Sequence, residues 1–146
     1  MTSTGVIKSF RDLEVYQRGM SLLKPVHDLA RTLPDYEKYD LANQLRRACK
    51  SVPANIAEGY AKRRSAKEFR AYLANAMGSA TEMEVHLEIA RELGYVTGEE
   101  ATQLIEQYQI LARQLYRLIE KWRSLEIRPP TSDLRATASS GSETKV

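Results

Sequence analysis

The chain has 146 residues, of which 42% are hydrophobic and 28% charged, and its formal net charge is +3. This length is enough for one domain with its own hydrophobic core. Seven glycines and five prolines favour long helices over a turn-rich β fold. No apolar run approaches the ~18 residues that would span a bilayer, which argues against a membrane protein.

Two further features point to a cytoplasmic protein. The single cysteine, Cys49, cannot form a disulfide within the chain, as expected in a reducing compartment. The segment from Met1 to Lys8 lacks the apolar stretch of a secretory signal peptide. We therefore expect a cytoplasmic location.

The first amphipathic helix is predicted from Leu13 to Thr32, with Asp12 as its N-cap and residues 1–11 as a preceding segment. Its apolar residues recur at steps of three and four, which is the spacing of one helical face. Pro25 lies inside this pattern and is expected to kink the helix or to weaken one of its turns. The predicted stripe consists of Leu13, Tyr16, Met20, Leu23 and His27, with Val15, Leu22, Val26 and Leu29 beside it.

The second helix is predicted from Tyr36 to Arg63, with Asp35 as its N-cap. Pro53 falls within the pattern, and we expect a bend there rather than a break. The predicted core stripe consists of Leu41, Leu45, Ala48, Val52, Ile56 and Tyr60.

The third helix is predicted to open with a capping box at Ser65-Ala-Lys-Glu68, in which each side chain satisfies a free backbone N–H, and to end at Gly94. Its predicted core positions are Phe69, Leu73, Ala76, Ala80, Met83, Leu87 and Ala90. This unbroken alternation of four- and three-residue steps is the most regular pattern in the chain.

The fourth helix is predicted to open with a second box, Thr97-Gly-Glu-Glu100, and to end near Ser124. Its predicted core positions are Leu104, Tyr108, Leu111, Leu115, Leu118 and Trp122. Residues 125–146 are rich in Ser, Thr, Ala and Gly and are predicted to be a disordered tail.

Four amphipathic helices joined by short loops bury their apolar stripes most simply against one another. The stripes keep a period near 3.5 residues, which is typical of packing at shallow crossing angles. We therefore predict an all-α fold, an up-down-up-down, left-handed four-helix bundle over residues 12–124.

The sequence shows no motif for catalysis or metal binding. His27 and His86 lie on different predicted helices, and neither has a second ligand at metal-binding spacing. Cys49 is predicted to be a small core residue. We therefore expect no enzymatic activity, no metal and no cofactor.

Polar residues share one face of the second predicted helix and lie beside the core stripe of the third. They are Arg47, Ser51, Asn55, Glu58, Ser79 and Glu82. The favoured interpretation is a buried hydrogen-bond network that fixes the register of the helices. The alternative is an enzyme pocket in which Glu58 and Glu82 act as paired carboxylates.

The charge is unevenly distributed, because residues 46–70 hold eight basic and two acidic side chains. The predicted nucleic-acid-binding residues are Lys62, Arg63, Arg64, Lys67 and Arg70 around one turn, with Arg46 and Lys50 as a second exposed spot. The helix dipole favours cations at a helix end but disfavours Lys67, in the first turn of the third helix. We predict contacts with RNA or DNA phosphates; the alternatives are a solvated surface or a protein scaffold.

Several stretches carry a family resemblance. They are Phe10-Arg-Asp-Leu13, Gln44-Leu-Arg-Arg-Ala48, Ser51-Val-Pro-Ala-Asn-Ile-Ala-Glu-Gly59, Ser65-Ala-Lys-Glu-Phe69 and Ala76-Met-Gly-Ser-Ala-Thr-Glu82. In this order they resemble the four-helix-bundle family first noticed in intervening sequences of bacterial 23S ribosomal RNA genes. The resemblance implies a bundle fold, a homo-oligomer such as a ring-like pentamer, and an association with nucleic acid, but no reaction.

Self-association is also suggested by tyrosines that lie outside the predicted core stripes. They are Tyr36, Tyr39, Tyr72, Tyr95 and Tyr116. Tyrosine is enriched in protein interfaces because it combines a large contact area with a polar tip. We therefore expect these residues to be candidates for contacts between subunits.

Overall fold

The computed structural model describes residues 5–126, and this part of the chain contains helices and no strands. Two short 3-10 helices are η1 (Phe10–Asp12) and η2 (Asp35–Glu37). The α-helices are α1 (Glu14–Ser21), α2 (Leu23–Arg31), α3 (Leu41–Ala61), α4 (Ala66–Glu92) and α5 (Gly98–Glu126). The predicted disordered tail, residues 125–146, lies almost entirely outside the described residues.

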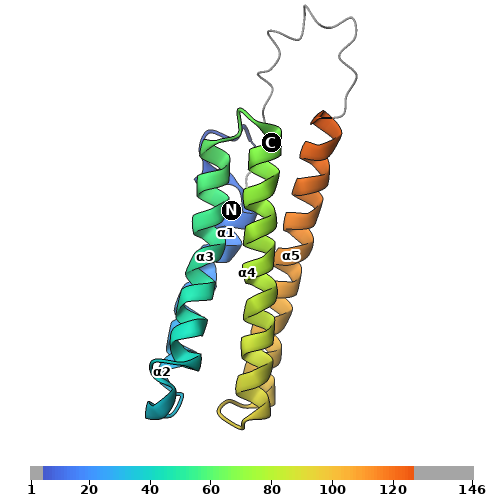
Figure 1. Cartoon of the computed structure of the whole chain (residues 1–146). Helices are drawn as coiled ribbons and strands as arrows, with labels where there is room; N and C mark the ends of the chain where they lie inside the picture. The colour runs from blue at the N-terminus through green and yellow to red at the C-terminus, as the bar shows by residue number, and fades with distance from the viewer. Residues whose placement is uncertain (1–4, 127–146) are drawn as a thin grey trace, which may run out of the picture.

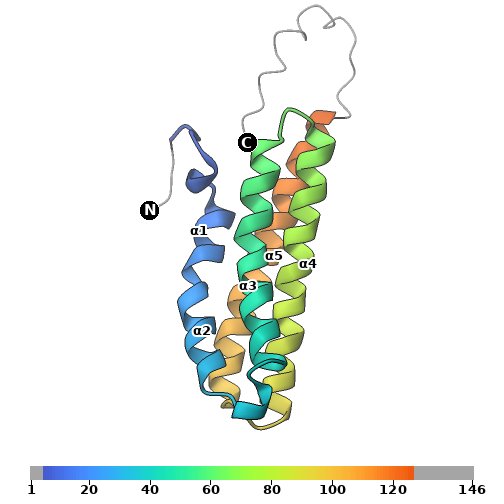
Figure 2. The ribbon, with the colours of Figure 1, turned by 60° about the vertical axis from the view of Figure 1, so that its left-hand side comes forward.

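The helices form the predicted all-α four-helix bundle, in which α1 and α2 together make one of the four columns (Figure 1). Neighbouring columns alternate in direction along the chain (Figure 2). The α3–α4 turn and the end of α5 lie at one end of the bundle, and η2 and the α4–α5 turn lie at the other. Within residues 5–126, no helix combines the length and apolar character needed to cross a membrane.

The first predicted helix is interrupted between α1 and α2, three residues before Pro25. Proline has no N–H to donate to the carbonyl four residues earlier, here that of Ser21, and its ring crowds the same carbonyl. The N–H of Leu22 instead bonds to the carbonyl of Gly19 at 3.3 Å. The expected kink is therefore a break, and it lies one turn before the proline.

The predicted N-cap at Asp12 is wrong. The Asp12 carboxylate accepts the backbone N–H groups of Lys8 and Ser9, at 2.8 and 3.1 Å, so it closes the capping box of η1 instead. The N-cap of α1 is Leu13, which makes no side-chain capping bond. Asp12 therefore belongs to the capping box of η1 and does not cap α1.

The second long helix begins five residues later than predicted, at Leu41, because η2 occupies Asp35–Glu37. The N-cap of α3 is Asp40, whose side chain makes no capping bond. The Glu37 carboxylate supplies an acceptor for the N–H of Leu41 at 3.1 Å, and it also accepts the Tyr95 hydroxyl at 2.8 Å. Asp35 is therefore not the N-cap of this helix. Pro53 lies inside α3, as expected.

The predicted signals at the ends of α4 and α5 are largely confirmed. Ser65 Oγ accepts the N–H of Glu68 at 3.1 Å. Thr97 and Glu100 form both bonds of a capping box, at 3.1 and 3.3 Å. After α4, Gly94 adopts a φ of +77° and the Tyr95 N–H bonds back to the Ala90 carbonyl at 2.9 Å, which is a Schellman ending.

The core follows the predicted stripes closely in the middle of the chain. All predicted core positions of α3 and α4 are buried. Phe69 and Trp122 meet edge to face near the α3–α4 turn, with ring centroids 4.8 Å apart. The predicted first stripe is partly wrong, because Met20 is 43% exposed while Val15 and Leu22 are buried. On α5 the buried face is shifted slightly, and Ile105 and Ile119 are more buried than Leu104 and Leu118.

Replacing Tyr108 with phenylalanine is expected to leave the free energy of unfolding unchanged or to raise it by about 1 kcal/mol. Tyr108 is fully buried and its hydroxyl has no hydrogen-bond partner. Removing that hydroxyl removes a desolvated polar group and keeps the ring in place. Urea denaturation of the two chains would measure the difference, and a clear loss of stability would indicate a partner for the hydroxyl.

Candidate nucleic-acid interface

The predicted basic residues occupy two separate places on the bundle. Lys62, Arg63, Arg64, Lys67 and Arg70 surround the α3–α4 turn. Arg46 lies near the start of α3, and at a rise of 1.5 Å per residue it is ~24 Å from Lys62 along the helix axis. Its guanidinium donates to the Lys38 carbonyl at 3.1 Å. Arg46 and the exposed Lys50 are thus a distinct second spot.

Three cations at the turn are exposed: Lys62, Arg64 and Lys67. Lys67 lies in the first turn of α4, where the helix dipole opposes a positive charge. The position of Lys67 in the helix is therefore electrostatically unfavourable.

Lys62 is partly neutralised by its own helix. Its ammonium lies 3.1 Å from the Tyr72 hydroxyl and 3.7 Å from Glu58 Oε2. The hydrogen bond to Tyr72, followed by the charge of nearby carboxylates, raises the pKa of Lys62 above its usual value. The lysine therefore stays charged, but the adjacent Glu58 carboxylate weakens its field.

Arg63 is half-buried, because it covers the end of the core. Its guanidinium lies 3.9 Å above the Tyr60 ring and donates to the Tyr60 carbonyl at 2.8 Å. Its role is thus at least partly structural, which the sequence pattern did not predict.

Packing brings further cations to the same end, from segments far away in the sequence. The last turns of α5 and the N-terminal segment both reach this end (Figures 1 and 2). We call it the basic end, and it comprises the five residues of the turn with Lys8, Arg11, Arg117, Lys121 and Arg123. Sequence reasoning missed the last five, since their proximity to the turn depends on the tertiary packing.

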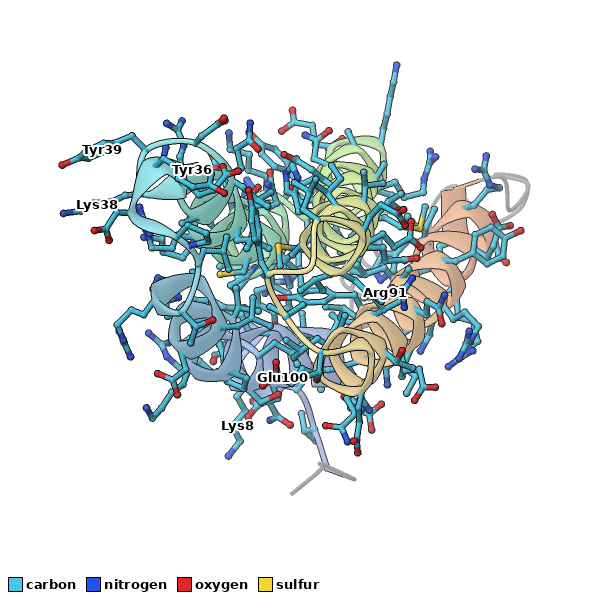
Figure 3. The ribbon with its side chains drawn as sticks, turned by 90° about the horizontal axis from the view of Figure 1, so that it is seen from below. Lys8, Tyr36, Lys38, Tyr39, Arg91 and Glu100 are labelled. Atoms are coloured by element: carbon cyan, nitrogen blue, oxygen red, sulfur yellow. The ribbon has the colours of Figure 1, made fainter. Side chains whose placement is uncertain are left out.

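The opposite end of the bundle is acidic. It is formed by α2, η2, the last turns of α4 and the first turns of α5. Its carboxylates are Asp28, Asp35, Glu37, Asp40, Glu84, Glu88, Glu92, Glu99 and Glu100. We call this the acidic end; Figure 3 looks onto it, with Tyr36, Tyr39 and Glu100 in view. The acidic end also carries Lys24, Arg31, Lys38 and Arg91, and the basic end also carries Asp12, Glu14, Glu58, Glu68 and Glu120. The excess charge is therefore negative at one end and positive at the other.

Half of the predicted polar network is present. Ser51 Oγ and Ser79 Oγ lie 2.8 Å apart between α3 and α4. The Asn55 amide donates to the Ser51 carbonyl at 2.9 Å and to Ser51 Oγ at 3.1 Å. These three half-buried residues join the two helices at one level, as a register-fixing contact requires.

The prediction is wrong for Arg47, Glu58 and Glu82, which are exposed. The Glu58 carboxylate accepts the Tyr72 hydroxyl at 3.2 Å, and Glu82 pairs with His86 at 3.0 Å. These carboxylates have separate partners, so the structure gives no support to a pocket built on the two together. Their long side chains lie at the edge of the helix face and reach water.

The structure also holds a cysteine–histidine contact that the sequence did not predict. Cys49 Sγ lies 3.9 Å from His27 Nδ1. The His27 Nδ1–H donates to the Leu23 carbonyl at 3.0 Å, so this nitrogen is not free to take the thiol proton. Burial raises the pKa of Cys49 to about 11. The thiol is therefore a protonated core group; in the described part of the chain no cluster of ligands could hold a metal ion.

Two hollows lie on the side of the bundle where α1 and α2 face α5. One, of about 600 Å³, is lined by residues that include Leu22, Pro25 and Leu104. The other, of about 400 Å³, lies nearer the basic end and includes Leu13 and Leu118. Between them Arg18 bridges the helices by donating to Gln107 at 2.7 Å and Gln114 at 3.1 Å. Both are open grooves, and neither is lined by Glu58 or Glu82.

The candidate interface tyrosines differ in exposure. Tyr36, Tyr39 and Tyr116 are exposed, whereas Tyr72 and Tyr95 are half-buried. The Tyr95 hydroxyl lies 3.3 Å from that of Tyr36 and bonds to Glu37, and these contacts raise the pKa of Tyr95. Tyr36 and Tyr39 project from the acidic end (Figure 3).

Comparison with known proteins relates the chain to a sequence family and to a solved fold. The model of the family described as 23S rRNA-intervening sequence protein matches residues 11–117. The crystal structure of a protein of unknown function, from the S23 ribosomal protein family of Bacteroides thetaiotaomicron VPI-5482, aligns with a TM-score of 0.66. It is 24% identical, over 72% of this chain and 97% of that chain, and shows the same fold. No curated protein matches the sequence.

Proposed function

Because the chain belongs to the 23S rRNA-intervening sequence protein family, we propose that it is a cytoplasmic, non-enzymatic homo-oligomer that binds the phosphate backbone of RNA or DNA. The observation that carries the proposal is the exposed pair Arg64 and Lys67 at the basic end. Lys67 stands where the helix dipole disfavours a cation, and a bound phosphate would offset that cost.

Contacts to phosphates fit the basic end better than contacts to bases. Tyr60 is buried beneath Arg63, and the Lys62 ammonium lies over the Tyr72 ring, 5.1 Å from its centroid. Neither aromatic ring is therefore free to stack on a base, as a single-strand binding platform requires. Binding is then electrostatic and largely independent of sequence.

Self-association strengthens this mode of binding. Each additional subunit repeats the basic end, and linked weak sites gain affinity from their effective concentration. The exposed Tyr36, Tyr39 and Tyr116 provide apolar area for contacts between copies. The subunit number that accompanies the family resemblance is five, in a ring of heterologous contacts.

A protein scaffold is the second candidate function. It is favoured by Tyr36 and Tyr39, which are 76% and 83% exposed beside the acidic end. Tyrosine is enriched in protein interfaces, because its ring offers a large contact area and its hydroxyl can donate a hydrogen bond. Under this alternative the acidic end holds a protein partner and the basic end is solvated.

Filter binding of the full chain to mixed RNA and DNA tests the proposal. Retention is expected at about 50 mM salt and should fall steeply towards about 200 mM, because displaced counterions oppose binding as salt rises. Unlabelled nucleic acids of unrelated sequence should compete for the protein equally well. Absence of retention at the lowest salt would contradict the proposal and favour the scaffold.

A further inference from the structure

Helix α5 carries a line of cations that continues the basic end towards the middle of the bundle. Arg113, Arg117 and Lys121 are exposed and follow one another at steps of four residues. At this spacing the side chains lie on one face of the helix, with a rise of ~6 Å from each to the next. Like charges four residues apart destabilise a helix, so helix formation does not favour this arrangement.

The dipole of α5 does not account for the line. The dipole stabilises cations in the last turn of a helix, where Arg123 lies, whereas Arg113 lies in the middle of α5. Glu120 is the single carboxylate between residues 107 and 125, and it pairs with Arg123 at 3.4 Å. The helix itself therefore does not neutralise this line of cations.

Helix α4, which packs along α5, does not neutralise the line either. Phe69 meets Trp122 near the basic end, and the Arg91 guanidinium donates to the Thr102 hydroxyl at 3.3 Å near the other end. The middle of α5 is therefore level with the middle of α4. Residues 71–81, which form that part of α4, include no charged side chain.

On the other side of α5, Asp12 and Glu14 line the 400 Å³ hollow together with Arg117. The Asp12 carboxylate already accepts the N–H groups of Lys8 and Ser9. Among the described residues, Glu14 forms no ion pair with Arg117. The charge of Arg117 is therefore available to a ligand.

An exposed aromatic ring accompanies these cations. Tyr116 is 55% exposed, and it lies three residues after Arg113 and directly before Arg117. Residues three apart are neighbours on a helix surface. In the described chain, cations lie over the rings of Tyr60 and Tyr72, but none lies over that of Tyr116. An open ring beside cations is what a single-strand binding surface requires, because the ring stacks on a base while the cations hold phosphates.

We propose that α5 binds a single strand of RNA or DNA, in which Arg113 and Arg117 contact neighbouring phosphates and one base stacks on Tyr116. The proposal rests on the proposed function and names the form of nucleic acid that the protein prefers. In a duplex the faces of each base are covered by its neighbours, so the ring gains no stacking contact there. Tyr116 is thereby assigned to nucleic acid, and contacts between copies are left to Tyr36 and Tyr39 at the acidic end.

The test compares the affinity of the full chain for single-stranded RNA and DNA oligonucleotides with that for duplexes of the same sequences, by fluorescence anisotropy. Tyr116→Leu is expected to weaken single-strand binding roughly tenfold and to leave duplex binding unchanged. Tyr116→Phe keeps the ring and should keep both affinities. Tyr39→Leu removes an exposed tyrosine at the opposite end and is the control. It should leave the ratio of the two affinities unchanged, because any effect on assembly acts on both.

Arg113→Gln combined with Arg117→Gln tests the phosphate contacts. The slope of log affinity for the single strand against log salt should become shallower by about 1.4, since two phosphates are no longer neutralised. A slope equal to that of the wild type would overturn the contact of α5 with phosphates.

Cross-linking tests the stacking contact without a variant. Irradiation of the wild-type chain with a single strand that contains iodouracil should cross-link Tyr116, as peptide mass spectrometry would show. Three results would each overturn the stacking contact and leave the rest of the proposed function standing: cross-links confined to the α3–α4 turn, an unchanged single-strand preference in Tyr116→Leu, or a loss of assembly mass in that variant. A wild-type chain that binds neither form of nucleic acid would contradict the proposed function itself.

Discussion

Replacing Gly59 with alanine is expected to lower the free energy of unfolding by about 1 to 3 kcal/mol, the usual range for overpacking a core. A Cβ at Gly59 would lie 2.6 Å from the Tyr72 Cβ and 3.1 Å from the Phe69 Cδ1. Neither atom is the free tip of a flexible side chain, so α3 and α4 would have to separate. The helix propensity gained by alanine, ~1 kcal/mol, offsets part of this loss.

Gly78→Ala is the matched control for this effect. Both glycines lie inside long helices, but the Cβ added at Gly78 meets nothing within 4 Å. The two substitutions should therefore shift the urea midpoint in opposite directions, downward at Gly59 and upward at Gly78. If Gly59→Ala were also stabilising, the close approach of α3 and α4 at this level would not be a constraint on the fold.

The sequence patterns predicted α3 and α4 well, because the residues that favour each helix locally also form its buried face in the bundle. The stripes of α3 and α4 repeat at a period near 3.5 residues, and every predicted core position on them is buried. Ser65, Gly94 and Thr97 mark the helix ends through bonds within a few residues. Such short-range signals do not depend on the rest of the fold.

The first column was predicted less well, since its geometry depends on interactions across the bundle. Gly19 packs against Val52 and Pro53 of α3, and this close contact determines which face of α1 is buried. A hydrophobicity pattern cannot predict such a contact, because glycine has no apolar side chain. The break near Leu22 then changes the helix phase between α1 and α2. Tyr16 and Met20 consequently lie outside the fully buried core.

In the candidate site, too, the residues that are close in sequence were predicted and those brought together by packing were not. The cations of the α3–α4 turn are contiguous in sequence and were predicted, whereas those of α5 and the N-terminal segment required the packed bundle. The predicted polar network is wrong at Glu58 and Glu82. Residues on a shared helix face can still extend long side chains away from the core and into water. The short side chains Ser51, Asn55 and Ser79 have no such freedom and do meet.

Arg64→Gln combined with Lys67→Gln is expected to flatten the salt dependence of RNA and DNA binding. If each residue neutralises one phosphate, the slope of log affinity against log salt should become shallower by about 1.4 to 1.8 in total. Affinity at low salt should fall similarly for all nucleic-acid sequences, because phosphate contacts carry no base information. Both residues are exposed, so the fold should be unaffected.

Arg47→Gln combined with Lys38→Gln is the matched control. This pair also consists of an exposed arginine and an exposed lysine, and its removal changes the net charge equally. Arg47 lies on α3 and Lys38 directly follows η2, and neither belongs to the basic end or to the predicted phosphate contacts. The control should alter the slope much less, since counterions are released where phosphates are contacted. Equal flattening by both pairs would show that binding follows overall charge, and the basic end would then have no special role. If neither pair changed the slope, the phosphate contacts would lie elsewhere on the bundle.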